Sequence, residues 1–512
     1  MKGDITIEKY EKLQAEFVLF QKESAEQIAD LKFQLENLKR MIFGAKSERY
    51  ISNNNPEQFS LFNPPSDEKK EAEVLEVPAH ERKKGKRKEK PVRLALPEHL
   101  ERKETILEPN IDLTDMVTIG EQRTEMLAYT PATLTVEVIV RPKYAPKQTK
   151  QQADTSIQIA ELPSRFIAKC VAHESLLAAI LVDKYVDHLP LYRTAGRFQR
   201  QGVRIPRSTL SGWVSQSAAK MQILYQALMK MVLESNYLQV DETRMEVQLK
   251  KTTKKKNGPP KKGKTHRGFL WGYNAVHEKL LFFEYDPTRE ATNPAKRLQG
   301  FTGTIQTDCY DVYDQIRNAY PNLTHYHCLN HARREFEKAL TNDAKRASHA
   351  MDKFQLLYAI ERRAAQENWT TEKIKQVRFE KAKPVLDELY TWMEIESLKV
   401  LPKSPIGKAM GYMLKRKQRM THYLTQGHLL IDTNPIENAI RPIAVGRKNY
   451  LFAGSHQAAQ NAAIFYSFFA CCKLNDVNPY EWLFDVMKKM PDSPVNQIHQ
   501  LLPHNWKKQQ IH

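Results

Sequence analysis

The second half of the chain predicts an α/β fold built on one mixed sheet. The β-like runs in this part of the sequence are Tyr237–Val240, Gly268–Tyr273, Lys279–Tyr285, Thr302–Thr307 and Leu323–Cys328. The first three runs follow one another, connections separate the last two, and a helix is expected at Asn330–Leu340. This order of elements suits an α/β sheet with an antiparallel half.

An N-terminal coiled coil is predicted over residues 1–50. Its apolar residues recur at alternating spacings of three and four, which is typical of an a/d seam. These residues are Ile28, Leu31, Leu35, Leu38 and Ile42. Because a coiled coil needs a partner strand, the seam favours a homodimer. The alternative is a single amphipathic helix that packs on its own body.

Residues 51–93 are expected to be a charged linker, and residues 94–160 a small β-rich unit. Seven of the ten residues from Glu81 to Lys90 are basic, so this run either docks on phosphates without reading sequence or is a solvated tether. In the β-rich unit, apolar residues at alternate positions from Leu134 to Val140 predict a strand.

Residues 161–235 predict a helical region with a helix-turn-helix. One helix runs from Leu191 to Gln201, Gly202 breaks it, and a second helix begins at Pro206 and runs to Val214. The candidate DNA-binding residues around this turn are Arg193, Arg197, Arg200, Arg204, Arg207 and Ser208. The alternative is an ordinary helical hairpin with a charged face.

Composition makes nucleic acid the first candidate partner. The 512 residues include 79 Lys and Arg against 60 Asp and Glu, a formal charge of +19, and such an excess favours polyphosphate. A basic housekeeping enzyme is the alternative. The five cysteines are odd in number and mostly scattered, which argues against a disulfide framework. The N-terminus lacks an apolar signal core and no apolar stretch is long enough to span a bilayer, so we expect a soluble cytoplasmic protein with no membrane partner.

Three acids are candidate ligands for two Mg²⁺ or Mn²⁺ ions. Asp241 and Asp308 each follow a predicted strand, and Glu437 lies in the first turn of a helix that begins near Asn434 and Pro435. Two divalent ions held by carboxylates can activate a nucleophile and stabilise a leaving oxygen at a phosphodiester. The alternative is that both aspartates cap turns and Glu437 is a surface residue.

Further polar residues surround these acids. Arg441, Arg447 and Lys448 follow Glu437 and either grip phosphates or form a solvated helix face. A second group contains zinc-ligand types, namely His325, His327, Cys328 and His331. Because alternate strand residues face opposite sides, Cys328 should diverge from His327 and a zinc site is disfavoured; His331 and Arg333 are placed near phosphate instead. Glu242 and Asp311 should point away from the three acids.

Several ordered motifs resemble the DDE transposases of the insertion-sequence family numbered sixty-six. They are Leu38-Lys-Arg-Met-Ile-Phe-Gly-Ala-Lys-Ser-Glu-Arg49, Asp187-His-Leu-Pro-Leu-Tyr-Arg193, Gln239-Val-Asp-Glu-Thr243, Leu270-Trp-Gly-Tyr273, Gly303-Thr-Ile-Gln-Thr-Asp308, Cys328-Leu-Asn-His-Ala-Arg-Arg-Glu-Phe336, Asn434-Pro-Ile-Glu-Asn-Ala-Ile-Arg-Pro442 and Gly446-Arg-Lys-Asn-Tyr-Leu-Phe-Ala-Gly-Ser455. The likeness runs from the zipper to the C-terminus.

The resemblance implies an RNase-H-like catalytic core, with catalytic roles for Asp241, Asp308 and Glu437. On this basis residues 236–340 form the first part of the core, 341–428 a helical insertion, 429–485 the final part with Glu437, and 486–512 a C-terminal tail. The implied activity is cleavage at transposon ends and transfer of the 3′ hydroxyl to target DNA, with accessory proteins of the same element as possible partners and a location in the bacterial cytoplasm at the nucleoid.

One departure from the family pattern leaves other functions open. The family usually carries a cysteine-rich zinc-binding segment at a place matching residues 110–150, and no cysteine precedes Cys170 here. A four-cysteine zinc site is therefore impossible in that segment. The alternatives are a decayed or domesticated DNA-binding protein, and a plain nuclease with the same core.

Overall fold

The computed structural model describes residues 134–140, 143–144, 158–159, 161, 163–249, 265–320 and 322–510. The predicted coiled coil, the charged linker, most of the β-rich unit and the loop at 250–264 lie outside these residues, so the predictions for them stay predictions. The chain divides into one unit of residues 1–55 and 139–512 and a second unit of residues 56–138. The architecture below is that of the described residues from 139 onward.

A five-stranded mixed sheet forms the centre of this unit, as the sequence predicts. Its strands are β3 (Tyr237–Gln248), β4 (Thr265–Ala275), β5 (Leu280–Asp286), β6 (Thr304–Thr307) and β7 (Thr324–His327). Their order across the sheet is β5-β4-β3-β6-β7. β3 pairs antiparallel with β4, as β4 does with β5, whereas β6 pairs parallel with both β3 and β7.

β3 is longer than predicted, and this changes the place of Asp241. The sequence places Asp241 at the end of a strand, but β3 continues through Gln248 because β4 pairs with it from Gln239 to Gln248. Met245 and Val247 are buried on this extension. Asp241 therefore lies within β3, just beyond the part that pairs with β6.

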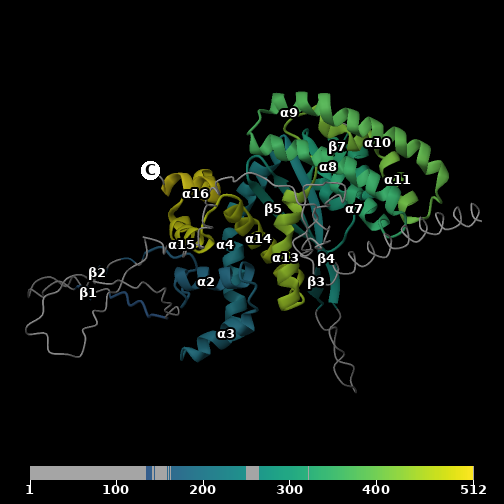
Figure 1. Cartoon of the computed structure of the whole chain (residues 1–512). Helices are drawn as coiled ribbons and strands as arrows, with labels where there is room; N and C mark the ends of the chain where they lie inside the picture. The colour runs from purple at the N-terminus through teal and green to yellow at the C-terminus, as the bar shows by residue number, and fades with distance from the viewer. Residues whose placement is uncertain are drawn as a thin grey trace, which may run out of the picture. The chain divides into compact units, whose positions relative to one another are not determined.

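Helices cover both faces of the sheet (Figure 1). The helices of this part of the chain include α4 (Arg207–Leu233), α5 (Thr292–Arg297), α6 (Asp311–Ala319), α7 (Leu329–Ala339), α13 (Asn434–Tyr450) and α14 (His456–Leu474). α14 packs on β5 and α4, and α13 packs on β3 and β4. The start of α13 therefore lies over the centre of the sheet.

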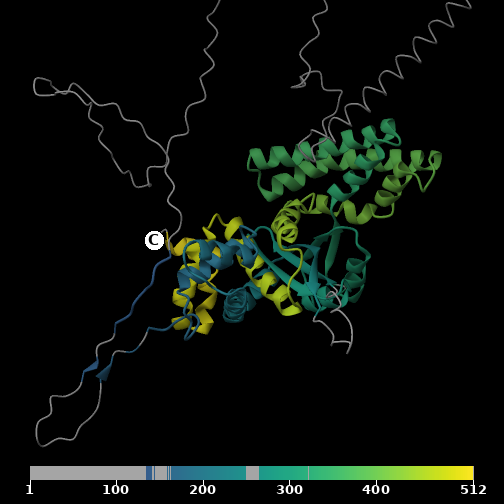
Figure 2. The same cartoon turned by 90° about the horizontal axis from the view of Figure 1, so that it is seen from below.

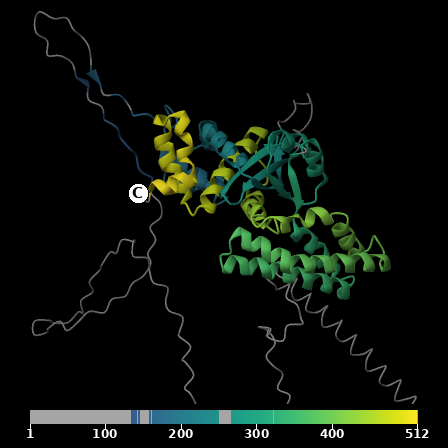
Figure 3. The ribbon, with the colours of Figure 1, turned by 90° about the horizontal axis from the view of Figure 1, so that it is seen from above.

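Residues 344–425 are helical, in agreement with the predicted insertion between β7 and α13. The segments are α8 (Ala344–Gln366), α9 (Thr371–Val377), η1 (Arg378–Ala382), α10 (Lys383–Glu396), η2 (Ser397–Lys399), α11 (Pro405–Leu414), α12 (Lys417–Met420) and η3 (His422–Thr425). Their shared core includes Phe354, Leu386, Leu389 and Met393, and it continues into α7 through Phe336. In Figures 2 and 3 these helices, drawn in green, lie on one side of the sheet and the C-terminal helices, drawn in yellow, lie on another.

The predicted helix-turn-helix has a longer second helix than expected. The region contains α2 (Glu174–Tyr185), α3 (Leu191–Arg200) and α4, and Gly202 follows α3 with a φ of +84°. α4 does not end at Val214 but runs to Leu233. Its buried residues continue with Ala218, Met221 and Leu228 because this part packs on β5 and α14.

One further prediction is wrong. Leu134–Val140 form no strand, and Val136 and Val138 are 88% and 74% exposed, so their alternation covers no buried face. Among the residues that the structure describes, the strands β1 (Lys143–Tyr144) and β2 (Gln158–Ile159) pair with each other. The predicted C-terminal tail, residues 486–512, is mostly helical up to residue 510: α15 (Pro479–Lys489), η4 (Met490–Asp492), η5 (Val495–Leu501) and α16 (Pro503–Gln510) follow in turn. Leu501 and Trp506 are buried there, and the indole N–H of Trp506 donates a hydrogen bond to the Asp485 carboxylate.

Within the described residues, no helix is both long enough and apolar enough to cross a membrane.

Candidate active site

Asp241 and Asp308 lie side by side at the centre of the sheet. The parallel register of β3 and β6 pairs Leu238 with Ile305 and Gln239 with Gln306. Continued by two residues, this register places Asp241 beside Asp308, which directly follows β6. Both side chains are half-buried, so they remain accessible from solvent.

The carboxylate of Asp241 lies on the sheet face that the start of α13 covers. Asp241 pairs with Gly272 across β4, and directly paired residues of antiparallel strands share a face. A Cβ on Gly272 would lie 3.0 Å from Cδ1 of Ile436, the residue before Glu437. Asp241, Asp308 and the first turn of α13 therefore converge on one face.

Glu242 points to the other face, as predicted. Its carboxylate accepts hydrogen bonds from the Tyr313 hydroxyl of α6 (2.9 Å) and from Arg289 Nε (2.8 Å). Asp311, the first residue of α6, is exposed. The strand period of two thus places Glu242, which binds Arg289, and Asp241 on opposite faces of the sheet.

The electrostatics of Asp241 favour a bound cation. Burial raises the pKa of Asp241 well above its usual value, and the neighbouring carboxylates of Glu242, Asp308 and Glu437 raise it further. A divalent cation would lower this pKa because it stabilises the charged form. Cation binding should therefore weaken as the pH falls and Asp241 takes up a proton.

Glu437 is paired with basic residues of α7. Arg334 Nη2 donates to Glu437 Oε2 at 2.7 Å, and His331 Nε2 lies 3.9 Å from Oε1. In the described part of the chain, the ligand oxygens of the three acids do not all lie within 4.8 Å of one another. Glu437 faces its cationic partner, and a metal must attract it away from Arg334.

The sequence interpretation missed Arg334 and placed Arg333 there instead. Arg333 is buried and donates to Asn330 Oδ1 at 3.0 Å, so it points into the protein. Arg334 follows His331 by three residues, and residues at this spacing share a helix face. This spacing was the available signal, since His331 was already placed near the site.

A buried amide network joins the segments that carry the three acids. Gln239 Nε2 donates to Gln306 Oε1 and to the backbone oxygen of Asp432, both at 2.8 Å, and Ile436 N donates to Gln239 Oε1 at 3.2 Å. Gln306 Nε2 donates to Leu430 O at 3.0 Å. Each glutamine lies two residues before one aspartate, on the same face, so the network holds β3, β6 and the start of α13 in register.

Comparison with known proteins places this site within a family. The model of the Transposase IS66 family matches residues 169–461, which contain all three acids. The chain belongs to this family. The model described as "Transposase C of IS166 homeodomain" matches residues 30–105, and the IS66 C-terminal element matches residues 467–504.

Three curated relatives of this IS66-family chain come from Sinorhizobium fredii, and each bears the name of an uncharacterized protein. The chain is 30% identical to y4qI over 95% of its own length and 90% of that protein. It is 29% identical to y4hP, with 82% of this chain and 78% of that protein covered. It is 28% identical to y4jD, with 94% and 96% covered.

The residues predicted to contact DNA in this IS66-family chain differ in exposure and in whether their side chains already bind other parts of the protein. Those with exposed side chains are Arg193, Arg200, Arg204, Arg207, Ser208, Arg441 and Lys448. Arg197 is paired with Asp183 of α2, where two hydrogen bonds join the side chains. Arg447 donates to Thr243 Oγ1 at 3.0 Å and to the backbone oxygen of Arg244, and these bonds tie α13 to β3.

The group of zinc-ligand residues splits in two, as the strand period predicts. Cys328 Sγ accepts a hydrogen bond from Thr433 N at 3.3 Å, and His331 faces Glu437. His325 and His327 instead face α6, where Asp314 joins them. The four residues therefore do not form one metal site.

Proposed function

We propose that this protein is the transposase of an insertion sequence and that Asp241, Asp308 and Glu437 are its catalytic residues. It would bind the ends of its element, cleave a phosphodiester with two Mg²⁺ or Mn²⁺ ions, and transfer the 3′ hydroxyl to target DNA. The observation that carries the proposal is the register that sets Asp241 beside Asp308, under the helix that bears Glu437.

An RNase-H-like core is part of the proposal. Support comes from the strand order β5-β4-β3-β6-β7, in which the first three strands along the chain are antiparallel and the next two continue in parallel. The central strand carries the first acid, its parallel neighbour leads into the second, and the helix after the insertion carries the third.

The donor set fits magnesium, which prefers carboxylate oxygens and keeps several of its waters. Asp241 and Asp308 would hold the ions from adjacent strands, and Glu437 would join them from α13. The ions would activate the attacking oxygen and stabilise the leaving one. The Arg334 guanidinium beside Glu437 would supply positive charge for a DNA phosphate next to the carboxylates.

The second candidate is a DNA-binding protein that no longer catalyses transposition. It is favoured by the absence of cysteine before Cys170, because the family's usual zinc-binding segment cannot form here. Metal-dependent cleavage of DNA that contains the element's ends separates the two candidates. Terminal inverted repeats in the DNA that flanks the gene, and accessory genes beside it, would test membership of a complete element.

Recognition of the DNA sequence by the helix-turn-helix can be tested with substitutions at the start of α4. Replacing Arg207 and Ser208 with alanine should weaken binding to the element's ends more than binding to random DNA, because both side chains are exposed at the first turn of the proposed recognition helix. Competition binding assays with the two DNAs measure the ratio. Deletion of residues 82–90 is the contrast: it should weaken both equally and flatten the salt dependence by about one unit of slope for each phosphate that the basic run binds. Equal losses of affinity in both variants would mean that α4 does not read the sequence.

Self-association is expected through the N-terminal seam. Replacing Leu31 and Leu38 with lysine would place charges at two seam positions. The dissociation constant of the dimer should therefore rise by a factor of at least about 10. Analytical ultracentrifugation measures this. Lysine at Gln27 and Gln34, which lie outside the seam, is the control. An unchanged mass distribution in the Leu31 and Leu38 variant would show that another surface dimerises the protein.

A further inference from the structure

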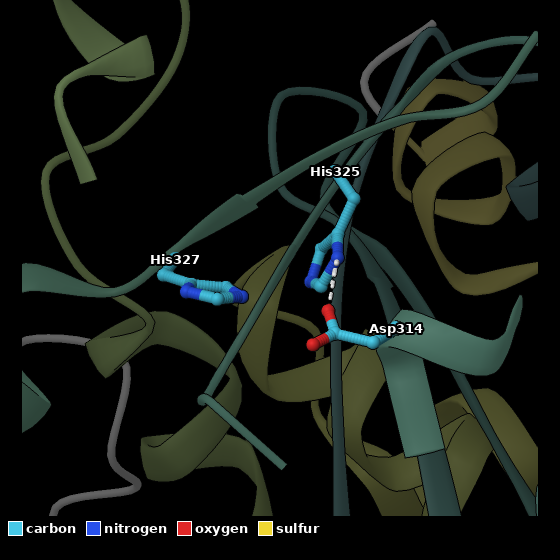
Figure 4. A group of neighbouring side chains, drawn as sticks. All are labelled: Asp314, His325 and His327. Atoms are coloured by element: carbon cyan, nitrogen blue, oxygen red, sulfur yellow. Dashed lines mark ion pairs between the residues drawn. The ribbon is translucent and has the colours of Figure 1, made fainter. Parts of the chain in front are cut away.

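A second cluster of metal-ligand side chains lies on the sheet face opposite the three acids. His325 and His327 occupy alternate positions of β7, and the register pairs them with Ile305 and Thr307 of β6. Asp314 of α6 faces them (Figure 4). One ligand atom from each of the three residues lies within 4.8 Å of the ligand atoms of the other two. Among the described residues, no other group of three His, Cys, Asp or Glu side chains lies so close together.

The hydrogen bonds of Thr307 define the tautomer of His325. The Thr307 hydroxyl donates its one proton to the backbone oxygen of Asp308 at 2.6 Å. It must therefore accept the 2.8 Å hydrogen bond that links it to His325 Nε2, so Nε2 carries the proton. Nδ1 of His325 is then a bare lone pair, buried and without a hydrogen-bond partner.

This lone pair faces a second acceptor. Nδ1 of His325 lies 3.7 Å from Asp314 Oδ1, which is too long for a hydrogen bond. The His327 ring points toward the same place in Figure 4, and one of its nitrogens lies within 4.8 Å of the ligand atoms of the other two residues. Two acceptors that face each other across this distance leave room for a shared cation.

Both imidazoles are neutral and ready to bind a metal. Burial lowers the pKa of His325 well below its usual value, with His327 and Arg419 adding to the effect, and burial also lowers the pKa of His327 to about 3. Neutral imidazoles need release no proton on metal binding at neutral pH. Nε2 of His325, the nitrogen that would not bind the metal, already donates to the Thr307 hydroxyl oxygen. In many metal-binding histidines the second ring nitrogen makes a hydrogen bond of this kind.

We propose that Asp314, His325 and His327 form a binding site for a divalent transition metal of the Zn²⁺ class, separate from the catalytic carboxylates. Two imidazoles and a carboxylate suit such an ion, and a half-exposed Asp314 leaves a fourth position for water. Arg419 of α12 also donates to Asp314 Oδ1. The metal must therefore displace Arg419, whose charge opposes it.

The site would act on the catalytic segment through two connections. A metal would join α6 to β7, and α6 begins three residues after Asp308. Thr307 also bridges His325 and the backbone of Asp308. Metal binding would thus hold the turn that carries the second catalytic acid.

Zn²⁺ binding by the full-length protein tests the proposal, whether or not the protein is a transposase. Metal-free protein in excess Mg²⁺, which occupies the carboxylate site, should bind one Zn²⁺ per chain in isothermal titration calorimetry. Losing a residue that hydrogen-bonds to a metal ligand lowers metal affinity by about 10–100-fold. Asp314→Asn removes a ligand itself, so it should lower the Zn²⁺ affinity by at least about 100-fold. Asp311→Asn, an exposed acid of the same helix, should change nothing. No Zn²⁺ binding by the unmodified protein, or equal affinity in the two variants, would overturn the proposal.

Arg419 supplies a test in the opposite direction. Arg419→Gln removes the charge that competes for Asp314, so Zn²⁺ should bind at least about 10-fold more tightly, by analogy with other partners of a metal ligand. If Arg419 instead builds the cluster as a structural ion pair, this variant should lose Zn²⁺ binding, and that result overturns the proposal. Circular dichroism melts of each variant ensure that only folded protein is compared.

Discussion

Asp308→Asn is expected to lower the rate of DNA cleavage by about 1,000-fold or more, since loss of about 4 kcal/mol of metal-dependent transition-state stabilisation has this effect. The substitution keeps the size of the side chain and its acceptor for Tyr310 N, which donates to Asp308 Oδ1 at 3.0 Å. The fold should therefore remain. DNA binding should persist because Asp308 is not one of the proposed contacts to DNA.

The measurement is single-turnover cleavage of labelled DNA that contains the element's ends, with Mg²⁺ and again with Mn²⁺. Asp311→Asn is the matched control, since it removes the same charge from the exposed start of α6, three residues away. Full activity of Asp308→Asn would rule out the proposed catalytic triad. Cleavage by neither the unmodified protein nor the variant, with binding intact in both, would favour the DNA-binding protein that no longer catalyses transposition.

Gln239→Leu should have the second-largest effect, on both stability and metal use. The leucine removes the buried hydrogen bonds of Gln239 with the Asp432 backbone oxygen and the Ile436 backbone N–H, which costs about 2–5 kcal/mol in the free energy of unfolding. Ile436 precedes Glu437, so the start of α13 loses its connection to β3. We therefore expect half-maximal cleavage at a higher Mg²⁺ concentration.

Two measurements separate positioning from mere destabilisation. Denaturant unfolding gives the change in stability, and a Mg²⁺ titration of cleavage, at a temperature where the variant is folded, gives the change in metal use. Gln248→Leu, near the far end of the same strand, is the control and should leave the metal requirement unchanged. If Gln239→Leu is less stable but has the normal Mg²⁺ requirement, Gln239 supports the fold and does not position Glu437.

The sequence alone was sufficient for the main elements of the fold. Each strand of the five-stranded sheet overlaps a β-like run that the sequence predicts, and the two aspartates directly follow such runs, so local patterns reveal them. The first turn of α13 was also predictable, because Pro435 suits the start of a helix and places Glu437 one turn inside it.

Patterns failed where a partner far along the chain decides the structure. The apolar alternation of Leu134–Val140 predicts a strand, but these residues form none, and all of them except Leu134 are exposed. α4 continues past Val214 because β5 and α14, from later parts of the chain, bury its second half.

Pairings across long stretches of sequence were decided only by the tertiary structure. Gln239 binds residues 193 and 197 positions later, and Arg334 binds Glu437 across 103 positions. Asp314 meets His325 and His327 only because β6 and β7 pair in parallel beneath α6. Residue type and spacing along a chain indicate which side chains have the chemistry of a site. Which of them meet depends on strand register and helix rotation, because a shift of one residue turns a strand side chain to the opposite face and a helical one by about 100°.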